Sequence, residues 1–173
     1  MNIVIATFES SPTFKTCHDR YKELGYDPII HNGLKIKNSI RKNQVCYLNF
    51  LEILKKYDDK DLIISEDDVW LNDKINIDNK EELNWLGWWR NSETQICGSM
   101  VIYIPKRLIP HVRRQFQAKN PGHLDYFLNG YFEFIVSEKP ICMELQHKSA
   151  TLEKIRKHKY VKEMPCEAQG TLL

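Results

Sequence analysis

Three consecutive acidic residues, Glu66-Asp67-Asp68, lie between segment 61–65, which has the apolar centre Leu-Ile-Ile, and the apolar segment 69–71. Carboxylates a few ångströms apart repel one another strongly at low dielectric unless a cation lies among them. Side chains alternate in an extended segment, so we expect Glu66 and Asp68 to point one way and Asp67 the other. Two carboxylates on one side suit Mg²⁺ or Mn²⁺, which also bind substrate phosphates. The acidic run therefore predicts a divalent-metal site; an exposed acidic turn or a helix cap is the structural alternative.

The elements ahead of the acidic run have the order strand, helix, strand, helix, strand. Apolar and polar periodicity, with helix caps, predicts them at residues 2–7, 12–24, 27–31, 38–57 and 61–65. This order is typical of a parallel α/β sheet with right-handed crossovers. Ligands of such sheets bind beyond the carboxyl ends of the strands, which is where the acidic run lies.

The second half of the chain predicts shorter elements. We expect strands at residues 84–89, 99–104, 132–136 and 141–146, a basic helix at 110–118 and a short helix at 124–129. No repeat, low-complexity tract or linker divides the sequence. We therefore expect one α/β domain over residues 1–173, with residues 148–173 forming a basic C-terminal tail.

Composition excludes several classes of protein. With 173 residues, 42% of them hydrophobic and 28% charged, the chain can bury a core, which argues against disorder and against a disulfide-dependent miniprotein. No apolar run reaches the roughly 18 residues of a membrane-spanning helix, and no secretory signal is evident. The five cysteines are widely spaced and include no CxxC pair, so we expect thiols in a reducing cytoplasm.

Charge is distributed unevenly along the sequence, although the net charge is only +2. Residues 58–82 contain ten acidic and three basic side chains, whereas residues 106–119 contain five basic side chains and no acidic one. Solvated faces would explain this pattern. The alternative is a divided surface, with carboxylates that hold a cation and flanking basic groups that meet an anionic ligand.

Residues 63–71 resemble the signature of GT-A-fold nucleotide-sugar glycosyltransferases, in which two hydrophobic residues and a variable one precede Glu-Asp-Asp and a further hydrophobic residue. The segment is most similar to glycosyltransferase family 25, the lipooligosaccharide and collagen galactosyltransferase relatives. Residues 98–105, 123–126 and 140–149 resemble later elements of that family, in the same order. The resemblance spans residues 2–149 and implies a single GT-A-like, Rossmann-like domain whose mostly parallel central sheet is flanked by helices.

The resemblance also implies an activity, namely metal-dependent transfer of a hexose or pentose from a nucleoside diphosphate sugar to a hydroxyl group. A UDP-sugar is the expected donor, and a glycan, a protein or a modified nucleic-acid base is the expected acceptor. The metal would be Mn²⁺ or Mg²⁺, and its expected ligands are Asp68, Glu66 and His147. The expected donor-binding residues are Thr7, Phe8, Glu9, Arg41, Glu66, Asp67 and Lys148. An inverting mechanism needs a base near the acceptor, for which Asp125 is the first candidate and Glu133 the second.

Two other classes remain open on sequence grounds. A nucleotidyltransferase would use similar carboxylates, but the segment after its first strand normally carries glycine, and residues 7–14 have none. A non-catalytic nucleic-acid-binding domain would use the basic stretches, because phosphate contacts dominate nucleic-acid affinity. The Lys-, Ile- and Asn-rich composition would fit an AT-rich viral genome, in which case the expected compartment is the host cytoplasm.

Overall fold

The computed structural model describes residues 1–7, 11–33, 42–90, 96–119 and 123–145. Within these ranges, strands and helices alternate from residue 2 to residue 66, as the sequence predicts. The helices are α1 (Phe14–Glu23), α2 (Lys42–Lys56), η1 (Lys106–Leu108), α3 (Ile109–Ala118) and α4 (Leu124–Tyr131). The strands are β1 (Asn2–Thr7), β2 (Ile29–Asn32), β3 (Leu62–Glu66), β4 (Val69–Leu71), β5 (Asn84–Arg90), β6 (Ile96–Ile104), β7 (Ile135–Val136) and β8 (Cys142–Glu144).

Six of these strands form one sheet in the order β2-β1-β3-β6-β5-β7, and β4 pairs with β8 in a second, two-stranded sheet. In the larger sheet β1 is parallel to β2 and β3, and β5 is parallel to β7. Strand β6 is antiparallel to both of its neighbours, β3 and β5. The strands other than β6 therefore share one direction, which confirms the predicted α/β class with a mostly parallel central sheet.

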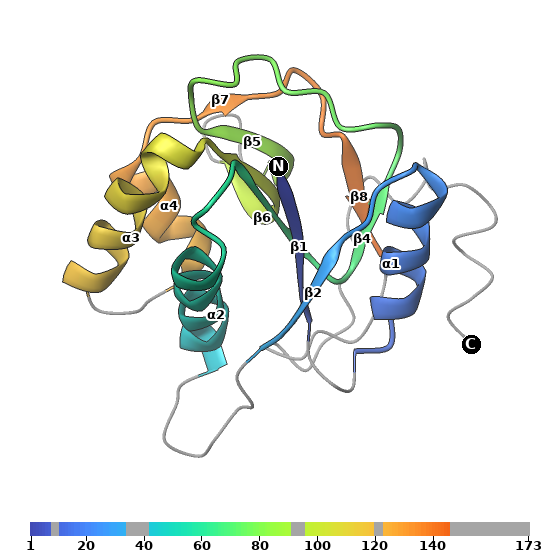
Figure 1. Cartoon of the computed structure of the whole chain (residues 1–173), viewed down its shortest axis with the longest axis horizontal. Coiled ribbons are helices and arrows are strands. Elements are labelled where there is room, and N and C mark those ends of the chain that lie inside the picture. Colours follow the sequence, from blue (N-terminus) through green and yellow to red (C-terminus); the bar gives the residue numbers. More distant parts are fainter. Residues whose placement is uncertain (8–10, 34–41, 91–95, 120–122, 146–173) are drawn as a thin grey trace.

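Side chains alternate along the central strands, so two separate cores form, one on each face of the sheet. Figure 1 shows α2, α3 and α4 on one side of the sheet and α1 with β4 and β8 on the other. On one face, even-numbered residues such as Val4, Leu62 and Ile64 pack against α2, α3 and α4. On the other face, Ile5 and Ile63 pack against α1 and against the β4–β8 sheet. The large sheet is therefore the middle of three layers, and its carboxyl edge is approached from both sides.

Helix α1 shows how local sequence sets an element boundary. It begins at Phe14 after Thr13, rather than at Pro12 after a serine cap as the sequence predicts. Its end is as predicted: Gly25 adopts a φ of 86°, its N–H donates to Lys22 O, and the N–H of Tyr26 donates to Tyr21 O. This pair of bonds is the Schellman arrangement, which favours glycine in the left-handed position.

The differences from the predicted elements lie mainly in the last strands. Strand β7 has two residues where 132–136 was expected, because Phe132 and Phe134 turn to pack against the core under α2, α3 and α4. Strand β8 has three residues where 141–146 was expected, and β6 begins at Ile96 rather than at residue 99. Strand β4 was not predicted, since its pairing partner lies more than 70 residues later in the chain.

Candidate functional site

The acidic run forms a tight turn rather than a continued strand. Strand β3 ends at Glu66, Asp67 and Asp68 make the turn, and β4 begins at Val69. The predicted alternation of the three carboxylates is therefore wrong, because the chain must change direction here to carry β4 into the second sheet. Asp67 is 9% exposed and Asp68 is 5% exposed. Two adjacent carboxylates are thus buried in one turn at the carboxyl end of a central strand.

The backbone of this turn is held by neighbouring elements. The carbonyl of Glu66 accepts hydrogen bonds from the Ser65 hydroxyl at 2.8 Å and from the Cys17 thiol of α1 at 3.6 Å. The carbonyl of Asp68 accepts a hydrogen bond from the N–H of Leu145 at 2.6 Å. Groups from β3, from α1 and from the segment after β8 therefore fix the two ends of the turn.

The burial and the charge of the turn also affect the pKa of its neighbour, Cys17. Burial raises the pKa of the Cys17 thiol far above its usual value, and the charges of Asp68 and Asp67 raise it further, against a hydrogen bond with the Val69 backbone that lowers it. Asp67 Oδ2 is buried and has no hydrogen-bond partner among the residues that the structure describes. A carboxylate in such a place is costly unless a cation compensates its charge.

Other buried polar side chains lie along the same edge of the sheet. Thr7 ends β1, is 3% exposed, and its carbonyl accepts a hydrogen bond from Gly33, the residue after β2, at 2.8 Å. A Cβ at Gly33 would lie 2.5 Å from the side-chain amide nitrogen of Asn49, so α2 packs directly on this strand end. Asn49 is 3% exposed and was not among the predicted residues. The sequence feature that could have identified Asn49 is its side-chain amide, which lies beside the apolar face of the helix predicted at residues 38–57.

The remaining predicted residues divide into two groups. Asp125 is half-buried in the first turn of α4, whose N-cap is His123, and Glu133 is exposed between α4 and β7. Helix α4 packs with α2 and α3, on the face opposite to α1, so these two acids come from a different layer than Cys17. The remaining candidates lie outside the described residues: Phe8, Glu9, Arg41, His147 and Lys148. The structure thus brings Thr7, Glu66, Asp67 and Asp68 to one edge.

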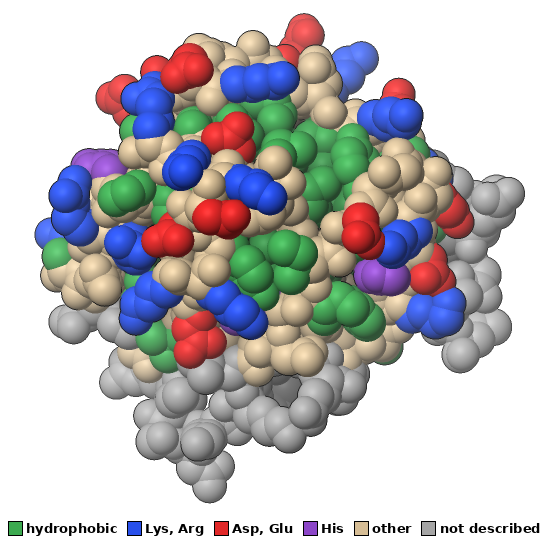
Figure 2. Space-filling view, viewed as in Figure 1, with side chains coloured by type: hydrophobic (Ala, Val, Ile, Leu, Met, Phe, Trp, Pro, Cys, Tyr) green, Lys and Arg blue, Asp and Glu red, His purple; other side chains and the backbone are tan. Residues whose placement is uncertain are grey.

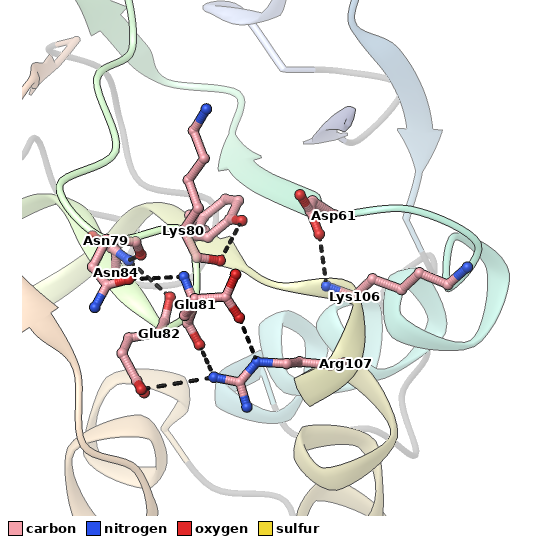
Figure 3. Close-up of polar contacts among 9 residues, drawn as sticks. Asp61, Asn79, Lys80, Glu81, Glu82, Asn84, Lys106 and Arg107 are labelled. Atoms are coloured by element: carbon pink, nitrogen blue, oxygen red, sulfur yellow. Dashed lines mark hydrogen bonds and ion pairs between the residues drawn. The ribbon is translucent and has the colours of Figure 1, made fainter.

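The basic stretch at residues 106–119 has partners within the chain. Arg107 pairs with Glu81 through Nε and Oε2 at 3.1 Å and contacts Glu82 at 3.7 Å (Figure 3). Arg113 pairs with Asp58 at 2.9 Å. Figure 2 accordingly shows acidic and basic side chains intermingled over α2 and α3 on the face in view. The alternative of separate acidic and basic surfaces therefore does not hold for these residues, because folding brings the two segments together.

The donor set at the acidic turn fits a magnesium-type ion. Within the described ranges, no three His, Cys, Asp or Glu side chains gather as metal ligands, so the turn offers the two buried aspartates. Mg²⁺ typically takes one or two protein carboxylates, keeps several waters and binds substrate phosphates as well. Oxygen ligands also suit Mn²⁺. Two carboxylates are therefore an oxygen donor set of the kind that Mg²⁺ and Mn²⁺ accept.

In the part of the chain that the structure describes, helices are too short or too polar to cross a membrane.

The sequence matches no protein-family model and no curated protein. Its structure is similar to the crystal structure of a glycosyltransferase involved in the glycosylation of the major capsid of PBCV-1. The TM-score is 0.55 and the identity 11%, over 79% of this chain and 81% of that one. At this identity the likeness establishes the fold, and the chain has a glycosyltransferase-like α/β fold.

Proposed function

We propose that this protein is a metal-dependent glycosyltransferase that moves a sugar from a nucleoside diphosphate sugar to a hydroxyl acceptor. The observation that carries the proposal is the burial of Asp67 and Asp68 in one turn at the carboxyl end of β3. In open α/β sheets this is the edge at which ligands bind. The glycosyltransferase-like fold supports the same reading, as does the resemblance of residues 63–71 to a nucleotide-sugar signature.

Asp67 and Asp68 would hold Mn²⁺ or Mg²⁺ through their carboxylates, and Glu66 would contribute from the end of β3. When bound, the metal neutralises the charge that develops on the diphosphate leaving group. The low exposure of the two aspartates keeps bulk water away, so their charges act at a lower dielectric than at the surface. Thr7 lies at the adjacent strand end, where its hydroxyl would meet the nucleoside part of the donor.

The small number of carboxylates has a consequence for the order of binding. Two aspartates leave most of a six-coordinate shell to water and to the diphosphate of the donor. We therefore expect metal alone to bind weakly and nucleotide alone to be repelled by the buried negative charges. Each should strengthen the binding of the other, which is the reciprocity that linked equilibria require.

The base that activates the acceptor is assigned to Asp125, with Glu133 as the alternative. Asp125 is half-buried, whereas Glu133 is exposed, so Asp125 is the better placed to act away from bulk solvent. His147 and Lys148 are retained as contacts to the metal and to the diphosphate. Asp125→Asn should lower kcat for transfer while leaving binding of nucleotide and metal unchanged, because a base is needed only in the chemical step.

Thermal unfolding in the presence of UDP, Mn²⁺ or both tests the central claim. Both together should stabilise the wild-type protein by about 2.7 kcal/mol when the ligand is present at roughly one hundred times Kd. Asp68→Asn should abolish this response. Asp78→Asn, which neutralises an exposed aspartate in the loop after β4, should retain it.

A panel of sugar nucleotides with Mn²⁺ then identifies the donor through release of the nucleoside diphosphate. Failure of every nucleotide to stabilise the wild-type protein in the presence of metal would contradict the proposal. Stabilisation by a single-stranded oligonucleotide without metal, unchanged in Asp68→Asn, would instead indicate a nucleic-acid-binding domain.

A further inference from the structure

In the absence of metal, the conformation of the turn at Asp67 and Asp68 is opposed by electrostatic repulsion. Asp67 and Asp68 are neighbours in sequence and both are buried, so their charges repel each other at a reduced dielectric. A turn free to relax would separate them. A metal would then have to restore the productive geometry, and its affinity would fall by the free energy of that rearrangement.

Two peptide planes flank this turn, one at its start and one at its end. The carbonyl of Glu66 belongs to the same rigid plane as the N–H of Asp67, and the carbonyl of Asp68 belongs to the plane of the Val69 N–H. Both carbonyls accept hydrogen bonds from outside the turn, Glu66 from Ser65 and Cys17 and Asp68 from Leu145. The planes that enter and leave the turn are therefore both fixed.

Cys17 has a particular position in this arrangement. Its thiol, on α1, donates to the carbonyl before the turn, at Glu66, at 3.6 Å. The side chain is fully buried on α1, among the apolar residues that pack the β4–β8 sheet against the large sheet. Ser65 is fully buried as well, and its hydroxyl supplies the second hydrogen bond to the Glu66 carbonyl.

We propose that Cys17 and Ser65 are positioning residues that hold the Asp67-Asp68 turn in its metal-binding conformation before metal and nucleotide arrive. The inference rests on the proposed function and assigns these residues a role in metal affinity, with no contact to the substrate. Residues that orient metal ligands typically change metal affinity by 10- to 100-fold when they are removed. The sequence gives no sign of this role, because Cys17 is an isolated cysteine 49 residues before the carbonyl that it contacts.

The test is the concentration of Mn²⁺ that gives half of the thermal stabilisation at saturating UDP. Cys17→Ala and Ser65→Ala should each raise this midpoint, and the double variant should raise it roughly ten-fold or more. Cys17→Ser should stay near the wild-type midpoint, since a hydroxyl keeps both a donor and an acceptor. The two alanine substitutions are made singly as well as together, so that the proposal can be tested even if only one of the variants folds.

Ser137→Ala is the matched control for Ser65→Ala. Ser137 is also buried, and its hydroxyl also donates to backbone carbonyls, those of Trp85 and Leu86, but these lie on β5. The Ser137→Ala variant should have a lower unfolding temperature and an unchanged Mn²⁺ midpoint. A general loss of stability would therefore not imitate the expected result.

The outcomes separate this inference from the function on which it rests. An unchanged Mn²⁺ midpoint in Cys17→Ala and Ser65→Ala, with a normal wild-type response, would overturn the positioning role and leave the proposed function standing. A wild-type protein that shows no metal-dependent response to UDP or to any nucleotide of the panel would overturn both. A midpoint that shifts equally in Ser137→Ala would also contradict the positioning role.

Discussion

Acidic side chains differ in exposure and pairing between the two edges of the sheet, the carboxyl edge of the parallel strands and the opposite edge. At the opposite edge, Glu81, Glu82 and Asp58 are partly exposed and pair with arginines. At the carboxyl edge, Asp67 and Asp68 are buried in a turn, and Asp67 has no ion-pair partner among the residues described. Surface pairs of the first kind contribute little to stability, whereas burial of carboxylates is costly.

The two groups of acids come from one stretch of sequence, residues 58–82, and are sorted by strand direction. Residues just before β3 and β5 lie at the opposite edge, and residues just after β3 lie at the carboxyl edge. Strand β6 runs the other way, so η1 follows it at the opposite edge, where the Lys106 N–H donates to Asp61 at 2.9 Å (Figure 3). Whether an acidic residue precedes or follows its strand therefore predicts its edge of the sheet better than the net charge of its sequence segment does.

The largest expected effect is the loss of activity when the carboxyl edge is neutralised. Asp67→Asn combined with Asp68→Asn should lower kcat/KM for sugar transfer by about 1,000-fold, because metal supplies several kcal/mol of charge stabilisation. The same variant should unfold at the same or a higher temperature, since it buries less charge.

Glu81→Gln combined with Glu82→Gln removes the same charge from the opposite edge. It should leave kcat/KM unchanged and slightly lower the unfolding temperature. Equal losses of activity in the two double variants would contradict the expectation that only the acids of the carboxyl edge contribute to catalysis.

The second prediction concerns the small β4–β8 sheet, which packs on the same face of the large sheet as α1. A Cβ at Gly87 of β5 would lie 2.4 Å from Cys142 Sγ and 2.9 Å from the Val101 nitrogen. Gly87→Ala should therefore lower the free energy of unfolding by about 2–3 kcal/mol through overpacking, measured by urea denaturation. Gly130→Ala, in a helix with open space around it, should raise stability instead.

Element types and the acidic site were predictable from the sequence because both depend on local patterns. Residues 62–64 are the apolar run Leu-Ile-Ile, and the acids follow after a single serine. The turn at Asp67-Asp68 was not predictable, because it depends on the pairing of β4 with β8. The supporting roles of Cys17 and Asn49 depend on the approach of α1 and α2 to the strand ends.

A third prediction uses His31 of β2, which is 7% exposed and lies 3.7 Å from Glu52 of α2. Burial lowers the pKa of His31, and Lys56 lowers it further, against the opposing charge of Glu52. The unfolded chain takes up this proton near pH 6.5 and the folded chain only at lower pH. The free energy of unfolding should therefore decrease as the pH falls below about 6.5, by at most about 1.4 kcal/mol per pH unit.

His31→Gln should remove this part of the pH dependence in urea unfolding measured between pH 5 and 8. His123→Gln, at an exposed histidine before α4, is the control and should leave the slope as it is in the wild type. A wild-type slope that persists in His31→Gln would place the responsible proton elsewhere.

The smallest expected effect belongs to the ion pairs of the opposite edge. Arg107 is about half exposed, so Arg107→Gln should lower the free energy of unfolding by about 0.5 kcal/mol, and less at high salt. The measurement is urea unfolding at low and high NaCl. A loss above about 2 kcal/mol would show that the stability of this edge also depends on charge.

The pairing of β4 with β8 joins Val69–Leu71 to Cys142–Glu144, far apart along the polypeptide. A long-range pairing of this kind requires closure of the loop between its two strands before any contact is gained. During synthesis, the aspartate turn therefore completes its support only after Leu145 has left the ribosome. A prematurely terminated chain could assemble much of β1, β2 and β3 and still fail to capture a metal, so the protein acquires its proposed chemistry at the end of its own folding.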